Sequence, residues 1–348
     1  MKKIFVFIVI IIFVIPVYTA SAQEKQEIRD LMEKVKNLES QMEKIGEETE
    51  ARRKLIITKE ETVEREKEIL TSVDKEEYTV EKKKSIGMTY NISYGYSAAD
   101  RLVLDVHDVV EGAHEYNHSM THSISVSYGL LDNLTVNTGV PFVYRYYKTG
   151  ASGSKDVTGI GDMSFGMSWQ PIKRTKGGLS TTFSGSVTLP TGRSPYKINP
   201  NTEISTGNGL YSISTGLNLS KPIDPLIVYG GLSYSRSFNF NVKDLHLNVG
   251  DFVLEEVEPG DSIDFKMGMA YALSYRASIN LGFNYSYGLS TTYHYSGHTK
   301  ETPIGTSASF SIGTGWKITP KTTISVGLGI SLIGGDDFTL SVGIPFTF

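Results

Sequence analysis

Residues 88–97 are Met-Thr-Tyr-Asn-Ile-Ser-Tyr-Gly-Tyr-Ser, and their alternation decides the fold. Apolar or aromatic side chains occupy every second position, so they lie on one face of a strand while small polar residues lie on the other. Each repeat of this pattern has the ~9–11 residues that a tilted strand needs to cross a membrane. The pattern returns in eleven later segments: 119–131, 133–146, 157–170, 179–190, 207–220, 225–238, 262–275, 277–289, 304–318, 321–333 and 337–348.

The connections between these segments alternate between short and long. Long outer loops with short inner turns are typical of outer-membrane barrels, and an even strand number leaves both ends in the periplasm. The sequence therefore predicts an all-β fold, a transmembrane antiparallel β-barrel of about 12 strands over residues 86–348. The short turns are 131–133, 171–178, 221–225, 275–277 and 319–321; the longer loops are 99–118, 147–156, 191–206, 239–261 and 290–303, with a tight sixth at 334–337.

The first 22 residues have the pattern of a secretory signal peptide. Lys2 and Lys3 precede an apolar run over 4–17, and Ala20-Ser21-Ala22 provides a small-x-small cleavage site. The run is shorter than the ~18–20 apolar residues of a membrane-spanning helix. We expect residues 1–22 to direct export.

Residues 23–85 are rich in charge and predict a periplasmic coiled coil and linker. Apolar residues recur at heptad spacing, which favours an α-helical coiled coil and a homo-oligomer formed through it. Polar residues interrupt the second half of the seam, so a solvated charged helix or a disordered linker is the alternative. The best-kept seam positions are Ile28, Leu31, Val35, Leu38, Met42 and Ile45.

Composition excludes several classes of protein. The 348 residues contain no cysteine, which excludes disulfides, thiolate metal sites and cysteine nucleophiles. A net charge of -4 gives no reason to expect nucleic-acid binding. We expect no cofactor. The final strand ends on Phe348, which resembles the terminal signal of outer-membrane barrels, so lipid and the barrel assembly machinery are the expected partners.

Three glycine-rich motifs resemble a known family. Gly159-Ile160-Gly161-Asp162, Leu189-Pro190-Thr191-Gly192 and Thr206-Gly207-Asn208-Gly209 are similar to motifs of the outer-membrane transporter-like proteins named after a meta-pathway of phenol degradation. The resemblance covers the barrel and implies an outer-membrane channel for hydrophobic or aromatic compounds. The predicted coiled coil is not part of it; its layout resembles the periplasmic stalk of certain sugar porins.

The predicted inner face carries small polar residues and few charges. Small polar walls leave room for water, whereas a closed interior would be filled with bulky side chains. The inward charges could set selectivity, or they could serve only as structural partners, with Arg145 and Asp162 pairing across neighbouring strands. The charged candidates are Arg145, Asp162, Asp264, Lys266 and Lys317.

The seven histidines are expected in or beside outer loops, where the first loop contains His114-Glu115-Tyr116-Asn117-His118. This H-E-x-x-H motif forms a zinc site only on a helix, and the nearby glycine and strand argue against a helix here. One hypothesis is that His114, His118 and His122 form a loose metal site. The other is that they are ordinary polar residues on the surface.

The sequence does not favour an enzyme. An outer-membrane phospholipase would need His and Ser on the same face of a strand, whereas His118-Ser119 and His122-Ser123 are adjacent and point to opposite faces. We expect a channel for small, neutral or hydrophobic solutes in the cell outer membrane. The alternatives are a structural anchor whose coiled coil binds a periplasmic partner, and a metal-capturing channel.

Overall fold

The computed structural model describes Lys36 and residues 80–103, 111–149, 153–172, 178–199, 202–223, 225–242, 253–274, 276–319, 322–334 and 337–347, with the backbone alone for 99–103, 111–114, 149 and 347. The predicted signal peptide (1–22), most of the predicted coiled coil and linker (23–85) and Phe348 lie outside the described residues. Lys36 is helical. No described helix has the length and apolar character needed to cross a membrane.

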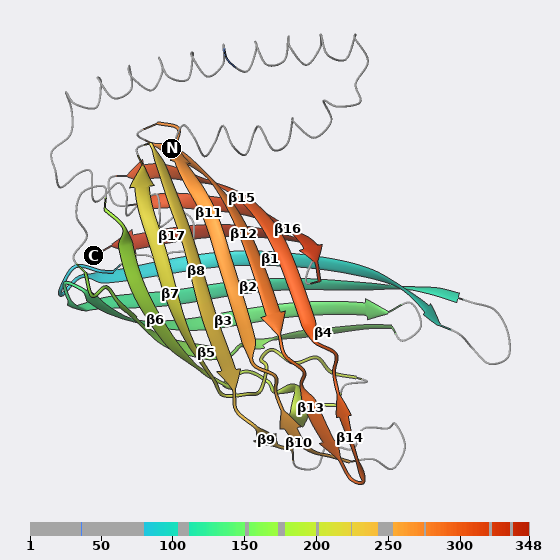
Figure 1. The fold of residues 1–348 in the computed structure, drawn as a ribbon. Helices are drawn as coiled ribbons and strands as arrows, with labels where there is room; N and C mark the ends of the chain where they lie inside the picture. Colours follow the sequence, from blue (N-terminus) through green and yellow to red (C-terminus); the bar gives the residue numbers. More distant parts are fainter. Residues whose placement is uncertain are drawn as a thin grey trace, which may run out of the picture. The chain divides into compact units, whose positions relative to one another are not determined.

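The described residues form a closed antiparallel barrel with twelve strand positions in its wall (Figure 1). It closes where β1 pairs with β17, for example Tyr90 opposite Ile344. Apart from β4, which pairs with β3 alone, each wall strand pairs with two neighbours, so the sheet closes on itself. The wall strands are β1 (Ile86–Val103), β2 (Glu111–Leu131), β3 (Leu134–Thr149), β4 (Gly153–Ile160) with β5 (Met163–Trp169), β6 (Ser180–Leu189), β7 (Ser212–Ile223), β8 (Leu226–Ser237), β11 (Ser262–Ala272), β12 (Ala277–Gly288), β15 (Gly305–Thr319), β16 (Thr322–Ile333) and β17 (Phe338–Thr347).

β4 and β5 share one place in the wall. Both pair with β3, and the break between them falls at Gly161 and Asp162. The predicted fourth strand is therefore one wall strand with a local interruption.

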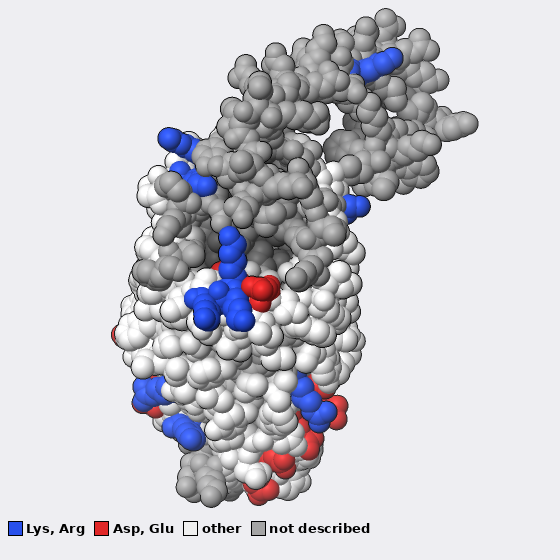
Figure 2. Space-filling model, turned by 90° about the vertical axis from the view of Figure 1, so that its left-hand side faces the viewer, with Lys and Arg blue, Asp and Glu red and all other residues white. Residues whose placement is uncertain are grey.

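The two faces of the wall follow the period-two pattern. Large apolar side chains on the outer face are solvent-exposed in the isolated chain, for example Phe165 at 46% and Leu232 at 55%. Serines and glycines alternate with them on the inner face. Among the described residues on the face in Figure 2, charged side chains gather toward the two ends and leave an uncharged band between them. The uncharged band and the exposed apolar side chains of the outer face together suit the lipid of an outer membrane.

Four short strands form a separate sheet at the end with the long connections (Figure 1). We call this sheet the cap; its order is β14-β13-β10-β9. One face packs a core of Val242, Leu254 and Val257 with aromatic rings around it. The cap strands are β9 (Phe240–Asn241), β10 (Leu254–Glu258), β13 (Thr292–Tyr295) and β14 (His298–Glu301).

Several predicted boundaries were wrong, and the predicted loops 239–261 and 290–303 contain the four cap strands. The first outer loop, predicted at 99–118, is shorter because β1 and β2 stay paired up to Val103 opposite Glu111. The sixth strand, predicted from 207, begins at Ser212. Gly207 and Asn208 lie against the Asp162 carboxylate instead of pairing in the wall.

Candidate functional site in the barrel lumen

A cavity of about 720 Å³ lies within the barrel and is lined from strands around the wall. Its lining is mainly small and polar, so the inner face leaves space rather than filling it with side chains. Asp162 is the only charged residue among the described residues that line it. The serines that line it include Ser93, Ser123, Ser125, Ser164, Ser184, Ser214, Ser233, Ser311, Ser325 and Ser341.

The Asp162 carboxylate holds the connection between β6 and β7 instead of facing the cavity alone. Its Oδ1 accepts a hydrogen bond from the Gly192 backbone N–H (3.0 Å), and its Oδ2 accepts one from the Asn208 N–H (2.6 Å). Hydrogen bonds to a charged acceptor are stronger than neutral ones. The three glycine-rich motifs, far apart in the sequence, therefore meet at one carboxylate.

Two threonines complete this junction, which we call the motif knot (residues 159–162, 189–192 and 206–209). Thr191 Oγ1 donates to the Gly161 carbonyl (2.8 Å) and accepts from the Met163 N–H (2.9 Å). Thr206 Oγ1 donates to the Ile160 carbonyl (2.8 Å) and accepts from the Arg193 N–H (2.8 Å). Three of these four bonds satisfy backbone groups at the break between β4 and β5, namely the Ile160 and Gly161 carbonyls and the Met163 N–H.

Glycine is required in the knot because its segments approach one another closely. A Cβ on Gly207 would overlap the Asp162 carboxylate, and one on Gly192 would lie 2.9 Å from the Gly207 Cα. Gly209 has φ +72, a left-handed conformation that favours glycine. The three glycine-rich motifs thus encode a packing junction.

The described chain between the second and third segments of the knot lies against the inner wall. Arg145 is on the inner face of β3, and its Nη1 donates to the Ser205 carbonyl at 3.0 Å. Glu203 and Ile204 share a second cavity with the inner-face residues Ser119 and Arg145. We call the described residues within 190–211 the inner loop, because this contact places them on the lumen side of the wall; they include the short 3-10 helix η2 (Pro195–Lys197).

The cap rests on the inner loop through aromatic contacts. Tyr196 packs against the cap core, with its ring centroid 5.8 Å from that of Phe240. Burial, with Tyr293 nearby, raises the pKa of the Tyr196 hydroxyl to about 12. The inner loop therefore has the wall on one side and the cap on the other.

The opposite end of the lumen also receives a piece of chain. The Glu81 N–H donates to Thr135 Oγ1 at 2.7 Å, and the Lys84 N–H donates to the Gly129 carbonyl at 2.7 Å. A Cβ on Gly129 would overlap the Lys82 carbonyl, so glycine is needed there. Residues 81–85 thus lie on the inner wall at the end of the short turns.

The five charged candidates are spread along the lumen. Arg145 lies near the outer end of β3, and Asp264 and Lys266 lie near the outer end of β11, whereas Lys317 lies near the turn that follows β15. Arg145 contacts the Ser205 carbonyl and Asp162 contacts backbone N–H groups, so these contacts do not favour the possible pairing of the two, which stays a prediction. These described residues do not form a single charged ring. Their role in selectivity stays a prediction.

The first histidine cluster lies on a strand. His118 and His122 are on β2, and their Nδ1 atoms lie 2.8 Å from the Tyr94 hydroxyl and 2.6 Å from the Tyr90 hydroxyl. Both point to the outer face, and residues four apart in a strand are about 13 Å apart. One ion could not bind both rings in this conformation. The site of His114, His118 and His122 stays a prediction that the strand geometry disfavours; the His114 side chain lies outside the described residues.

Sequence reasoning missed the inner loop and the knot. The clustering of Gly and Thr at the ends of predicted strands was the available signal, because Thr hydroxyls and Gly close contacts serve chain junctions rather than strands.

The comparisons with known proteins agree with this architecture. The family model described as "Putative MetA-pathway of phenol degradation" matches residues 93–343. An outer membrane channel from Pseudomonas putida F1 is similar in structure, with TM-score 0.60 and 14% identity over 79% of this chain and 100% of that chain. The translocator domain of autotransporter NalP from Neisseria meningitidis gives TM-score 0.46 and 12% identity, over 78% and 91% of the two chains.

Proposed function

This chain belongs to the family described as "Putative MetA-pathway of phenol degradation", and from that premise we propose that it is an outer-membrane channel for small, neutral or hydrophobic solutes. The observation that carries the proposal is the cavity of about 720 Å³ with its small polar lining. Asp162 is the one charged residue among the described residues that line this cavity, and its two oxygens accept backbone hydrogen bonds in the knot, so this part of the lumen offers little free charge to bind an ion.

The inner loop and residues 81–85 set the size limit for solutes. Each lies on the inner wall at a different end of the lumen, so each reduces the free cross-section there. A constriction with few charges selects by size more than by charge. The family description supports aromatic compounds related to phenol as solutes.

The test is solute flux and conductance of the purified full chain in lipid. We expect liposomes to swell in glucose, and the reversal potential in a salt gradient to stay near zero because the lumen has little fixed charge. Asp162→Ala should raise the conductance, because the inner loop loses its anchor. Ser164→Ala, which changes another cavity-lining residue, is the matched control. Absence of flux, or strong preference for one ion sign, would contradict the proposal.

We also propose that the N-terminal segment is a periplasmic stalk that joins barrels. An even strand number puts both barrel ends in the periplasm, and a heptad seam buries little surface unless it meets another helix. Three barrels per assembly is the expected number by analogy with stalked porins. Mass measurement in mild detergent, before and after polar replacement of Leu31 and Leu38, tests this. A monomer before replacement would reject self-association and leave the stalk as a linker or a hook for another protein.

A further inference from the structure

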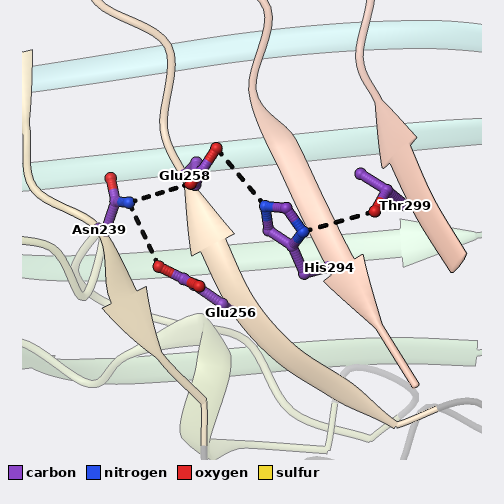
Figure 3. Close-up of polar contacts among 5 residues, drawn as sticks. All are labelled: Asn239, Glu256, Glu258, His294 and Thr299. Atoms are coloured by element: carbon purple, nitrogen blue, oxygen red, sulfur yellow. Dashed lines mark hydrogen bonds and ion pairs between the residues drawn. The ribbon is translucent and has the colours of Figure 1, made fainter. Parts of the chain in front are cut away.

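The face of the cap opposite its apolar core gathers three groups that can bind a metal. Glu256 and Glu258 lie two residues apart on β10, and His294 lies on β13 opposite Glu256. One ligand atom from each lies within 4.8 Å of the others. Figure 3 shows Asn239 in contact with both glutamates, and His294 in contact with Glu258 and Thr299.

Two polar side chains hold these ligands in place. Asn239 Nδ2 donates to Oε1 of Glu256 (3.2 Å) and to Oε1 of Glu258 (3.3 Å), so it leaves one oxygen of each carboxylate for another partner. Thr299 Oγ1 lies 3.4 Å from Nδ1 of His294. Partners of this kind orient the ligands in metal sites.

The imidazole supplies a second, independent observation. His294 Nε2 is shielded from solvent and has no hydrogen-bond partner among the described residues, yet it lies 3.5 Å from Glu258 Oε2. If Nδ1 carries the proton toward Thr299, the Nε2 lone pair faces a carboxylate lone pair. A cation between the two atoms would satisfy both lone pairs, whereas a proton on Nε2 would make the same contact a long ion pair with Glu258.

We propose that Glu256, Glu258 and His294 bind a divalent first-row transition metal ion, with zinc the best match. Zinc takes imidazole nitrogen at ~2.0–2.1 Å and carboxylate oxygen at ~2.0–2.2 Å, often with three protein ligands and one water. Tetrahedral ligands at those lengths are about 3.4 Å apart, close to the 3.5 Å between Nε2 and Oε2. Calcium and magnesium prefer oxygen alone, so the imidazole selects against them.

The ion would link β10 to β13 and so fasten the cap. These two strands carry Val257 and Tyr293, which belong to the apolar core on the other face. A metal bond across the same pair of strands would act together with that core. This site is separate from the lumen, so its test does not depend on the proposed channel function.

The experiment measures zinc binding to the full chain, folded in detergent, stripped with a chelator and carrying no histidine tag. Calorimetry and elemental analysis should give one bound zinc per chain. Glu256→Gln, Glu258→Gln and His294→Gln should each weaken this binding by at least tenfold, and Asn239→Ala by roughly 10–100-fold. The electrophoretic shift of folded barrels on heating shows that each variant is assembled.

Two controls separate this site from other histidines. His298→Ala changes the other face of the cap, where His298 stacks on Tyr295 (4.9 Å), and should leave zinc binding unchanged. The triple variant His114→Ala, His118→Ala, His122→Ala should also keep it. The proposal is overturned if no zinc binds, if the three ligand variants bind normally, if the triple variant abolishes binding, or if calcium binds as tightly as zinc.

Discussion

The barrel wall and the cap are stabilised in different ways. The wall turns its large apolar side chains outward, as with Met167 at 54% exposed, and keeps small residues inside. The cap turns its apolar side chains inward, so Val257 is 0% exposed, and packs aromatic rings around them. The wall therefore depends on lipid to cover its apolar surface, while the cap carries its own core.

This difference implies that the two regions can be perturbed separately. A charge on the outer wall should affect assembly in the membrane and leave the internal contacts of the cap intact. A change at the motif knot should loosen the inner loop and the cap while the strand pairing of the wall persists. The next experiments compare the two regions in this way.

The largest expected effect is on the outer wall. Val126→Arg places a charge on the lipid face of β2 and should cost ~2–4 kcal/mol near the middle of the bilayer. Ser125→Arg is the matched control, because Ser125 is the next residue in the strand and lines the lumen cavity. Urea unfolding in lipid vesicles measures the change in the free energy of unfolding for both variants. Equal losses would show that the assignment of the two faces is wrong.

The second effect is on the knot. Gly207→Ala drives a Cβ into the Asp162 carboxylate and should cost the docked inner loop ~1–3 kcal/mol. Trypsin cleavage at Arg193 or Lys197 should become roughly 5–150-fold faster, because proteolysis follows the population of the open loop. Folding of the barrel on heated gels should not change.

Gly305→Ala is the control for this substitution. A Cβ there meets no atom within 4 Å, although Gly305 begins a wall strand. Cleavage equal to wild type is expected. If Gly207→Ala also stopped barrel assembly, the wall and the cap would not be separable.

The wall could be predicted from the sequence because each strand repeats one local rule. Residues 262–275 alternate, and β11 occupies Ser262–Ala272 with Phe265 outward and Lys266 inward. No such rule specifies the inner loop, whose conformation depends on Asp162 meeting Gly192 and Asn208 from distant segments. The cluster of Glu256, Glu258 and His294 was missed for the same reason, since the pairing of β10 with β13 brings them together.

The smallest expected effect is the response of the cap to alkaline pH. The docked cap holds the pKa of Tyr196 at about 12, against 10.0 for an ordinary tyrosine. Because the docked state holds this proton more tightly, the contribution of Tyr196 to docking is complete below pH 10 and is lost as the pH rises toward 12. Solvent screening at this partly buried site reduces that contribution to about 1 kcal/mol or less.

The absorbance of tyrosinate, taken as the difference between wild type and Tyr196→Phe, isolates this one hydroxyl among the 20 tyrosines. We expect a midpoint near pH 12 in the wild-type background. In the Gly207→Ala background the midpoint of the same difference absorbance should move toward pH 10, because the loosened inner loop exposes the ring. A midpoint that stays near 12 in that background would mean that the cap core holds Tyr196 without the knot, and the two would then have to be treated as independent parts.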